Sequence, residues 1–306
     1  MINIFICMTP LHLLISEKIL EQKINKVNFL IYIPNRNTEQ NKHYFDRVNC
    51  SFHKAYYNPI DKNLFIYLYE IIKVCLKLRN DDKINYFVGN LKSVFSRLPM
   101  LITGYKEINI FDDGFANILP NSFLYQPEKK YIKIFFKIFN SRLEYEIAQN
   151  SIKKYYTIFK NNQILNHTYI ELFKNTSSIN SKNTRSILLT SPFSEYKILD
   201  TEEESNLYKK VIQEYSITDV LMHPNEKKIK ISEINILNDI FIAEEYVSML
   251  SKTSNIIVYA FYSTALLNLS LNDNLNIICL HYKKIHTIKN KIIFNSLDIK
   301  VKEISL

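Results

Sequence analysis

Short apolar runs alternate with amphipathic segments along most of the chain. Ile2–Cys7 and Val27–Ile33 are mainly apolar and have the length of buried strands. The apolar residues between these runs recur at the spacing of one helix face, in a segment that extends to about Gln22: Leu11, Leu14, Ile15 and Ile19. Thr9 can cap this helix. Pro10 suits its first position, because the N–H that proline lacks would have no hydrogen-bond partner within the helix there. A strand, a helix and a second strand in this order predict the opening of a Rossmann-like unit.

The same alternation continues through both halves of the chain. In the first half we predict strands over Tyr86–Val88, Ile108–Phe111 and Lys154–Phe159, and helices over Asn63–Leu78, Leu91–Leu98 (stopped by Pro99) and Lys129–Tyr145. In the second half we predict strands over Ile187–Leu189, Asp219–Met222, Asn255–Phe261 and Leu275–Leu280, and helices over Glu202–Glu214 and Glu244–Leu250. Residues 175–183 are polar and low in hydrophobic content, as in a linker. The sequence therefore predicts an α/β protein with two Rossmann-like domains, residues 1–174 and 184–306, joined by the linker 175–183.

Composition narrows the class of ligand. The 306 residues carry a formal net charge of +9, and 47% of them are hydrophobic, which is enough to fill the cores of two domains. The positive charge favours an anionic partner such as nucleic acid, acidic lipid, or a phosphorylated or sugar-nucleotide substrate. No RNA- or DNA-binding signature accompanies this charge, so we expect no nucleic-acid partner.

The cysteines and the N-terminal segment indicate where the protein works. None of the four cysteines has the paired spacing of metal ligands, and Cys7 and Cys279 lie in apolar, strand-like runs where we expect buried thiols. Met1–Leu14 has no basic leader, and Thr9, Pro10 and His12 interrupt its apolar run. The segment is too short to span a bilayer. We therefore expect a reduced, cytoplasmic protein.

Polar motifs follow three of the predicted strands: Asp112-Asp113-Gly114, His223-Pro224 and Ser263-Thr264. The carboxyl ends of parallel strands meet at one edge of a sheet, which is where open α/β sheets bind ligands. Taken singly, each motif also fits an ordinary turn or helix cap. Together they suit the transfer of a sugar from a phosphate leaving group. A carboxylate can act as the general base, a protonated histidine can stabilise the departing phosphate, and hydroxyls at a helix start can seat it.

Several further residues are candidates by position alone. His12 would lie in the first turn of the helix that Thr9 and Pro10 begin, either as a backbone-bonded structural histidine or in contact with substrate. Gly114 allows a sharp turn after the two acids. Residues that end or follow predicted strands in the second half complete the set: Ser191, Pro192 and Pro224. No Asp-x-Asp metal motif is present, so we expect no required cofactor and a divalent cation that is at most stimulatory.

The motifs also carry a family resemblance. The segment Cys7–Ile19, the residues Phe111-Asp112-Asp113-Gly114, and the His223-Pro224 and Ser263-Thr264 pairs resemble, in order, the bacterial lipooligosaccharide α-2,3-sialyltransferases. The resemblance extends over nearly the whole chain. It implies a GT-B fold, in which two Rossmann-like domains face a central cleft. It also implies an inverting transfer of sialic acid from CMP-sialic acid to a terminal galactose of a bacterial surface glycan, lipooligosaccharide or capsule.

The resemblance further implies a role for each motif. Asp113 would be the general base, with Asp112 as its rival, because the sequence does not show which side chain points into the cleft. His223 would serve the leaving phosphate as general acid or cation, and Ser263 and Thr264 would hold the CMP phosphate. No motif matches the residues that contact cytosine or ribose, and the choice between an α-2,3 and an α-2,6 linkage stays open.

Two other functions fit the sequence. One is a glycosyltransferase of the same family with a different nucleotide sugar, such as a glucosyltransferase. The other is a non-catalytic partner in glycan assembly at a membrane surface. In the predicted helix Lys129–Tyr145, lysines and apolar residues are expected on opposite sides: Lys129, Lys133 and Lys137 against Ile132, Phe135, Phe136 and Phe139. Such a helix can rest on the inner face of an anionic membrane or simply present a solvated basic face. The sequence is also compatible with a homodimer.

Overall fold

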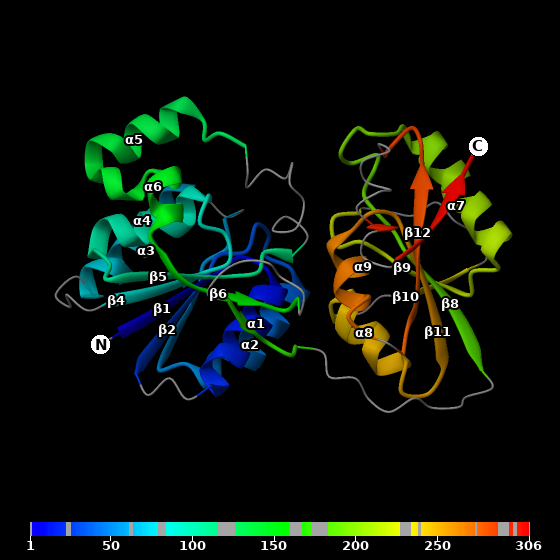
Figure 1. The fold of residues 1–306 in the computed structure, drawn as a ribbon, viewed down its shortest axis with the longest axis horizontal. Helices are drawn as coiled ribbons and strands as arrows, with labels where there is room; N and C mark the ends of the chain where they lie inside the picture. The colour runs from blue at the N-terminus through cyan, green and yellow to red at the C-terminus, as the bar shows by residue number, and fades with distance from the viewer. Residues whose placement is uncertain are drawn as a thin grey trace. The chain divides into compact units, whose positions relative to one another are not determined.

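The chain divides into two compact units, which we call unit 1 (Met1–Leu172) and unit 2 (Phe173–Leu306) (Figure 1). The computed structural model describes residues 2–22, 26–60, 64–78, 84–114, 126–159, 167–172, 183–226, 234–237, 240–272, 274–286, 294–295 and 299–305. Each unit has a parallel β-sheet, flanking helices and a hydrophobic core of its own. Of the expected linker 175–183, only Asn183 lies among these residues.

The sheet of unit 1 has seven parallel strands in the order β3-β2-β1-β4-β5-β6-β7. The strands are β1 (Ile2–Cys7), β2 (Val27–Tyr32), β3 (Lys54–Tyr57), β4 (Ile84–Val88), β5 (Glu107–Phe111), β6 (Ile152–Thr157) and β7 (His167–Tyr169). The chain leaves β1 toward one edge of the sheet and later returns to build the other edge from β4. The strand order therefore reverses between β1 and β4. Open α/β sheets bind ligands outside the carboxyl ends of the strands at such a point.

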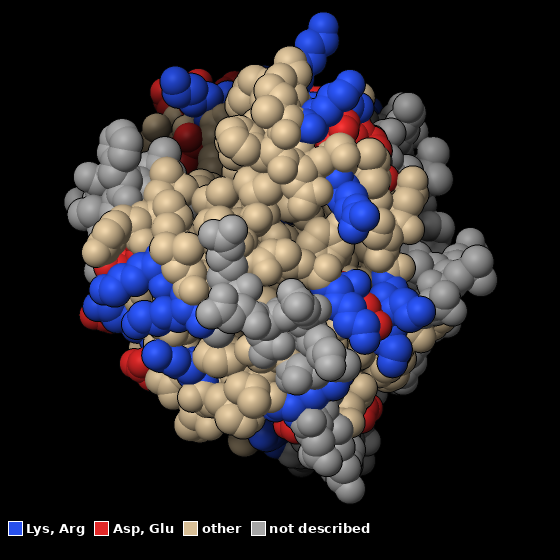
Figure 2. All heavy atoms as spheres, turned by 90° about the vertical axis from the view of Figure 1, so that its left-hand side faces the viewer, with Lys and Arg blue, Asp and Glu red and all other residues tan. Residues whose placement is uncertain are grey.

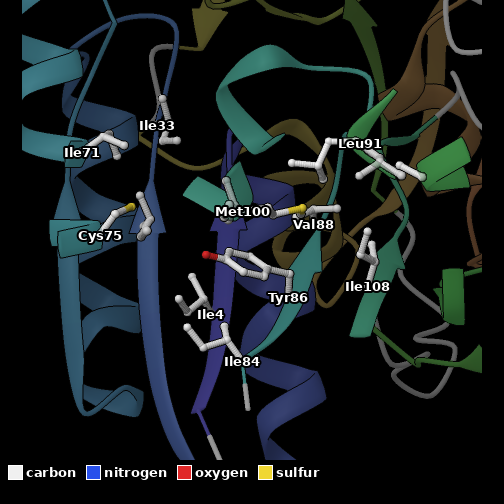
Figure 3. Close-up of a cluster of buried hydrophobic side chains, with 14 of the residues drawn as sticks. Ile4, Ile33, Ile71, Cys75, Ile84, Tyr86, Val88, Leu91, Met100 and Ile108 are labelled. Carbon is white, nitrogen blue, oxygen red and sulfur yellow. The ribbon is translucent and has the colours of Figure 1, made fainter. Parts of the chain in front are cut away.

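Helices cover both faces of this sheet. They are α1 (Pro10–Glu21), α2 (Glu39–Val48), α3 (Leu64–Leu78), α4 (Val94–Thr103), α5 (Lys130–Asn140) and α6 (Tyr145–Asn150), with the 3-10 turns η1 (Asn49–Ser51) and η4 (Ser141–Leu143). In Figure 1, α1 and α2 lie on one face of the sheet, and α3 and α4 lie on the other. On the second face, alternate strand residues such as Ile4, Tyr86 and Val88 pack against Met100 of α4 and Cys75 of α3 (Figure 3). This core fixes the strands whose ends carry the polar motifs.

Two predictions about the helices of unit 1 were wrong. The helix expected to stop at Pro99 continues to Thr103, with Pro99 inside it. Proline disfavours a helix interior because it lacks an N–H, but Met100 after it is fully buried in the core. The helix ends at Gly104, whose φ of 76° lies in the left-handed region and whose N–H donates to the Met100 carbonyl.

The single helix predicted over Lys129–Tyr145 is broken into α5, η4 and α6. At the break, the Asn140 side chain accepts a hydrogen bond from the Arg142 N–H, and the Leu143 carbonyl accepts one from a buried arginine. Of the residues predicted on the apolar side of this helix, the structure buries one and exposes another. Phe136 is fully buried, whereas Phe139 is 63% exposed.

Unit 2 repeats the strand order of unit 1. Its six parallel strands are arranged as β10-β9-β8-β11-β12-β13. The strands are β8 (Thr184–Leu189), β9 (Asp219–Leu221), β10 (Asn235–Leu237), β11 (Asn255–Ala260), β12 (Asn276–Tyr282) and β13 (Lys300–Ile304), and the helices are α7 (Thr201–Tyr215), α8 (Ala243–Leu250) and α9 (Thr264–Leu269). Figure 1 shows α7 on one face of the sheet and α8 and α9 on the other. The strand order reverses between β8 and β11, so the same rule predicts ligand binding outside the carboxyl ends of these two strands.

Candidate active site

The two adjacent acids after β5 face different surroundings. Asp112 is fully buried, and its carboxylate accepts hydrogen bonds from the Tyr155 hydroxyl, the Thr157 hydroxyl (2.8 Å) and the Ile158 N–H (2.7 Å). Burial raises the pKa of Asp112 to about 6, while these three hydrogen bonds and the nearby His12 act in the opposite direction. The carboxylate of Asp112 thus ties the end of β5 to β6.

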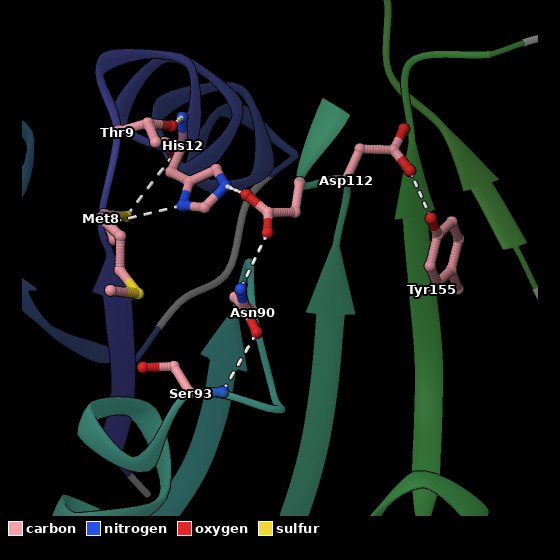
Figure 4. A network of polar contacts seen from close by, with 9 residues as sticks. Met8, Thr9, His12, Asn90, Ser93, Asp112 and Tyr155 are labelled. Atoms are coloured by element: carbon pink, nitrogen blue, oxygen red, sulfur yellow. Dashed lines mark hydrogen bonds and ion pairs between the residues drawn. The ribbon is translucent and has the colours of Figure 1, made fainter. Parts of the chain in front are cut away.

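Asp113 turns away from β6 and is partly exposed. Its Oδ1 lies 2.9 Å from Nε2 of His12, and its Oδ2 accepts a hydrogen bond of 2.9 Å from the Asn90 side chain. His12 comes from α1 and Asn90 follows β4, so two other segments of unit 1 contact the carboxylate that follows β5. Figure 4 shows these contacts, with Asp112 directed to the other side toward Tyr155. Gly114 follows at a φ of 70°, a backbone conformation that other residues rarely adopt.

The start of α1 places His12. Thr9 is the N-cap, and its side chain accepts a hydrogen bond from the His12 N–H, with Pro10 in the first turn, as the sequence predicted. The Met8 N–H donates to Nδ1 of His12 at 3.1 Å. Because Nδ1 accepts, the ring hydrogen lies on Nε2, which donates to Asp113. His12 is therefore bonded both to backbone and to an acid.

In unit 2, the ends of β8 and β9 are joined through Glu226. Its Oε2 accepts hydrogen bonds from the Thr190 hydroxyl and from the backbone N–H of His223 (2.9 Å). Burial raises the pKa of Glu226 to about 7, and the carboxylates of Glu204 and Glu195 raise it further, while the hydrogen bonds from Thr190 and His223 lower it. This contact fixes the segment that carries His223-Pro224.

The ring of His223 is oriented by its own turn. The Asn225 N–H donates to Nδ1 of His223 at 3.1 Å. The ring hydrogen therefore lies on Nε2, and the side chain is half-buried while Pro224 is exposed. His223 can present an N–H donor from a turn that the backbone holds in place.

The loop after β8 is held by a tyrosine. The buried Tyr208 hydroxyl of α7 donates to the Ser191 carbonyl at 2.6 Å and accepts from the Ser191 N–H at 2.9 Å. Pro192 follows and is buried. Ser191 and Pro192 thus belong to a fixed loop that follows the carboxyl end of β8.

Ser263 and Thr264 follow β11, the strand that pairs with β8. Ser263 is the N-cap of α9, and its Oγ accepts a hydrogen bond of 3.1 Å from the Leu266 N–H. The Ser263 hydroxyl hydrogen can still point away from the helix. Tyr262 before it is held by the buried His281, whose Nδ1 lies 3.0 Å from the tyrosine hydroxyl.

The structure therefore gathers the predicted residues at two sheet edges, one in each unit. Unit 1 holds Thr9, Pro10, His12, Asp112, Asp113 and Gly114, and unit 2 holds Ser191, Pro192, His223, Pro224, Ser263 and Thr264. Sequence reasoning missed Asn90 and Glu226, which contact the predicted residues directly. Asn90 follows a predicted strand, so its position was a signal for it. Within the described ranges, no group of three or more His, Cys, Asp or Glu side chains is gathered as a metal site.

A family model described as Glycosyltransferase family 52 matches residues 25–284, which is most of the chain. The chain belongs to glycosyltransferase family 52. Its relationship to bacterial α-2,3-sialyltransferases, predicted from the motifs, is confirmed by curated relatives that align over most of their length.

Three of these relatives illustrate the similarity of the family 52 chain. The CMP-N-acetylneuraminate:beta-galactoside alpha-2,3-sialyltransferase of Pasteurella multocida is 25% identical over 285 residues, 91% of each chain. The N-acetyllactosaminide alpha-2,3-sialyltransferase of Haemophilus influenzae is 26% identical over 287 residues, 90% of each chain. A protein of the same name from Neisseria meningitidis is 22% identical over 299 residues, 91% of this chain and 78% of its own.

Solved structures share the fold of the family 52 chain at low sequence identity. The UDP-GlcNAc 2-epimerase of Neisseria meningitidis has a TM-score of 0.57 at 9% identity, over 98% of this chain and 87% of that chain. The calicheamicin glycosyltransferase CalG4 has a TM-score of 0.53 at 9% identity, over 99% of this chain and 85% of that chain. With its two parallel α/β sheets, the chain has a GT-B fold, as predicted.

Proposed function

We propose that this family 52 protein is an inverting sialyltransferase, which moves sialic acid from CMP-sialic acid to a terminal galactose of a bacterial surface glycan in α-2,3 linkage. The observation that carries the proposal is the alignment of about nine-tenths of the chain with three proteins that are each named α-2,3-sialyltransferases. The fold alone would not support this activity. An epimerase and a glycosyltransferase with the same type of fold resemble this chain to a similar degree.

Asp113 is our candidate for the general base. In an inverting transfer, the acceptor hydroxyl attacks the anomeric carbon of sialic acid, its proton passes to a carboxylate, and the bond to the CMP oxygen breaks. Asp113 has an oriented and partly exposed carboxylate. Asp112 is fully buried and accepts three hydrogen bonds, so an acceptor sugar does not reach it in this arrangement.

His223 is our candidate for the residue that serves the leaving phosphate. With Nδ1 accepting from Asn225, the Nε2–H can donate a hydrogen bond to a phosphate oxygen and stabilise its growing charge. Full proton transfer from the ring would require protonation at Nδ1 and loss of the Asn225 contact. The hydroxyls of Ser263 and Thr264 are proposed to donate to the same phosphate.

A direct assay tests the proposal. The purified protein should release CMP and form sialyllactose when it is incubated with CMP-sialic acid and lactose. UDP-glucose and UDP-galactose with the same acceptor are the matched controls for another donor. Product with a UDP-sugar and none with CMP-sialic acid would assign the family 52 chain a different donor.

We also propose that the transfer needs no metal, because an N–H donor at His223 and two hydroxyls can take over the stabilisation of phosphate charge. Turnover in excess EDTA should stay within about twofold of the untreated enzyme, and Mg²⁺ should at most stimulate it by screening phosphate charge. The measurement is the rate of CMP release before and after chelation. A complete loss that Mg²⁺ or Mn²⁺ restores would contradict the proposal.

The surface of α5 supports a peripheral contact with the inner face of an anionic membrane. Large apolar side chains on this helix are exposed: Tyr131, Ile134, Phe135, Ile138 and Phe139. Lysines of the same helix and its first turn are exposed as well: Lys129, Lys130, Lys133 and Lys137. Figure 2 shows uncharged surface bordered by Lys and Arg side chains on this side of the molecule. An apolar stripe beside lysines fits acyl chains beside acidic headgroups. None of the described helices is long and apolar enough to span a membrane.

A further inference from the structure

We infer that His12 and Asn90 are positioning residues that hold the Asp113 carboxylate in one orientation. We also infer that position 89 must be glycine because the His12 ring occupies the space that a Cβ would need. The inference rests on the proposed role of Asp113 and adds how the fold prepares this acid. Each of its two oxygens receives one N–H at 2.9 Å, Oδ1 from His12 and Oδ2 from Asn90. The two donors come from different elements, so together they fix the plane of the carboxylate.

Both donors are themselves oriented by backbone groups. The Met8 N–H donates to Nδ1 of His12, which leaves the hydrogen on Nε2. The Ser93 N–H donates to Oδ1 of Asn90, which turns the amide Nδ2 toward Asp113. A carboxylate has two oxygens, and each can accept one of these two N–H hydrogen bonds. An amide at this position has one oxygen that can accept, and its NH2 group would face the second N–H donor. The site is thus built for an acid at position 113.

Gly89 is required by the His12 ring. A Cβ at position 89 would lie 2.3 Å from Cε1 of His12 and 2.5 and 2.6 Å from its two ring nitrogens. A contact this short cannot form, so an alanine here would displace the ring. Phe111 also packs against the ring in a T-shaped contact, with centroids 5.3 Å apart, and His12 is 1% exposed. The chain has three glycines in all, and this one lies directly beneath a side chain that bonds the proposed base.

The orientation matters because a general base must lie within hydrogen-bond reach of the proton that it removes. A misplacement of about 1 Å can lower turnover by about 100-fold. We therefore expect His12→Ala and Asn90→Ala each to lower kcat about 10–100-fold, with the KM for CMP-sialic acid changed less than about twofold. In His12→Gln, the amide Nε2–H can reach the same oxygen, so we expect a smaller loss of kcat than in His12→Ala.

His53→Ala is the matched control. The Nδ1 of His53 also accepts a backbone N–H, from Asn28 at 3.1 Å, but His53 precedes β3 and lies at the opposite edge of the sheet from Asp113. This variant should keep the kcat of the wild type. Equal losses in His53→Ala and His12→Ala, or a kcat of His12→Ala within twofold of the wild type, would overturn the inference.

A double-mutant cycle tests the part played by Gly89. Gly89→Ala should lower kcat as His12→Ala does, because the added methyl displaces the ring. If the methyl acts only through the ring, Gly89→Ala/His12→Ala should be no worse than His12→Ala alone. If the loss of kcat in the double variant equals the product of the two single losses, Gly89 acts through a contact other than the His12 ring.

A spectroscopic readout separates this inference from the proposed function. In ¹⁵N-labelled protein, His12 should show an unprotonated Nδ1 and a protonated Nε2, and Asp113→Asn should shift the Nε2 resonance while His53 stays unchanged. This measurement needs no activity and no substituted His12. If the wild type transfers no sialic acid but shows this pattern, the proposed function fails and the positioning stands. A hydrogen on Nδ1, or an unchanged Nε2 in Asp113→Asn, would overturn the positioning even if transfer is observed.

Discussion

At the scale of single residues, the Asp112-Asp113 pair shows how one motif can hold two unlike acids. Successive side chains of an extended chain point to opposite sides, so one acid faces β6 and the other faces α1 and the end of β4. The first is a buried crosslink between strands. The second is partly exposed, and only its position suits a reaction with a substrate from solution.

Asp113→Asn should therefore lower turnover by about 100-fold or more, because it removes the base. Binding of CMP should stay nearly intact, since the proposed phosphate contacts belong to unit 2. Turnover is measured by CMP release and binding by calorimetry. Asp112→Asn is the matched control, and we expect it to reduce thermal stability more than Asp113→Asn does, because a buried carboxylate with three donors is replaced. A dead Asp112→Asn of normal stability beside an active Asp113→Asn would move the base one residue upstream.

Glu226 allows a prediction on pH. Its pKa in the folded protein is about 7, above the ordinary 4.5, so the folded state binds more protons than the unfolded state between these values. The contribution of Glu226 to the free energy of unfolding therefore falls as the pH rises from about 4.5 to about 7. Glu226→Gln should reduce this fall, because the glutamine oxygen can accept from both Thr190 and His223 without a charge.

Urea unfolding at pH 5 and pH 8 measures the effect. The drop in the free energy of unfolding between the two pH values should be smaller in Glu226→Gln than in the wild type. Glu202→Gln, an exposed position on α7, is the control and should leave the drop unchanged. An equal drop in all three proteins would mean that Glu226 titrates alike in the folded and unfolded states.

The sequence predicted the strand ends that carry polar residues but not the partners of those residues. The direction of Asp112 and Asp113 depends on a single-residue register at the end of β5, which an apolar pattern does not define. Asn90 and Glu226 were not predicted. Asn90 contacts the Asp113 side chain and Glu226 contacts the His223 backbone, and both contacts depend on how other strands are placed. For His12 the sequence allowed a structural role or a role at the substrate. The contact that bears on this choice is with Asp113, 101 positions along the chain, and the sequence does not show it.

At the scale of elements, a buried ion pair anchors α5. Arg97 of α4 is fully buried and forms an ion pair with Glu128, just before α5, and it donates to the Leu143 carbonyl at 2.8 Å. Its guanidinium lies 4.1 Å from the ring centroid of Phe136, the buried residue of α5. One arginine thus contacts both ends of the α5 segment and the middle of the helix.

Arg97→Ala should lower the free energy of unfolding by about 3–5 kcal/mol, because it leaves Glu128 buried without a partner. Arg97→Met combined with Glu128→Leu should recover much of that loss, since an apolar pair of similar volume removes the unpaired charge. Chemical denaturation gives both values. The exposed Arg142 of η4 provides the control, and Arg142→Ala should change the free energy of unfolding by less than about 0.5 kcal/mol. A small effect of Arg97→Ala would show that water or another cation reaches Glu128.

Elements with a strong apolar period were predicted, and short or polar ones were missed. The strands β1, β4, β8 and β11 are buried and were recognised, whereas β3, β10 and β13 are short or only half-buried and were not. The helix α2 is mostly polar, with Tyr44 and Val48 as its buried residues, so its pattern was weak. At Pro99 a strong local signal gave a wrong prediction. Proline usually ends a helix, but here the burial of α4 in the core outweighs that preference and the helix continues.

At the scale of the whole molecule, two units with the same strand order divide the proposed reaction. The proposed base lies in unit 1, and the proposed contacts of the leaving phosphate lie in unit 2. Substitutions in one set should therefore affect the acceptor step and the donor step separately. The proposed residues thus come from motifs far apart in the sequence, and no single continuous motif contains them.

The exposed surface of α5 should bind an anionic membrane. Exposed lysines are each worth about 1 kcal/mol near an anionic leaflet, although Lys133 of α5 also pairs with Glu146 at 3.3 Å. The apolar side chains of Ile138 and Phe139 are 72% and 63% exposed. We expect salt-sensitive binding to vesicles of anionic phospholipid and little binding to neutral ones. Replacing Lys129, Lys133 and Lys137 by Gln should weaken this binding and the activity on a lipid-linked acceptor, while activity on lactose stays unchanged.

Two comparisons make the vesicle experiment decisive. The same substitution at three exposed lysines of unit 2, Lys209, Lys252 and Lys283, removes the same charge elsewhere and should leave vesicle binding intact if the α5 surface is the contact. Ile138→Ser removes apolar area without changing charge, so it should weaken binding most at high salt, where the lysines contribute least. Equal losses on the lipid-linked acceptor and on lactose would mean that the α5 lysines serve the fold or the active site. A dimer in sedimentation that Ile138→Ser dissociates would assign this face to a second copy of the chain instead of to a membrane.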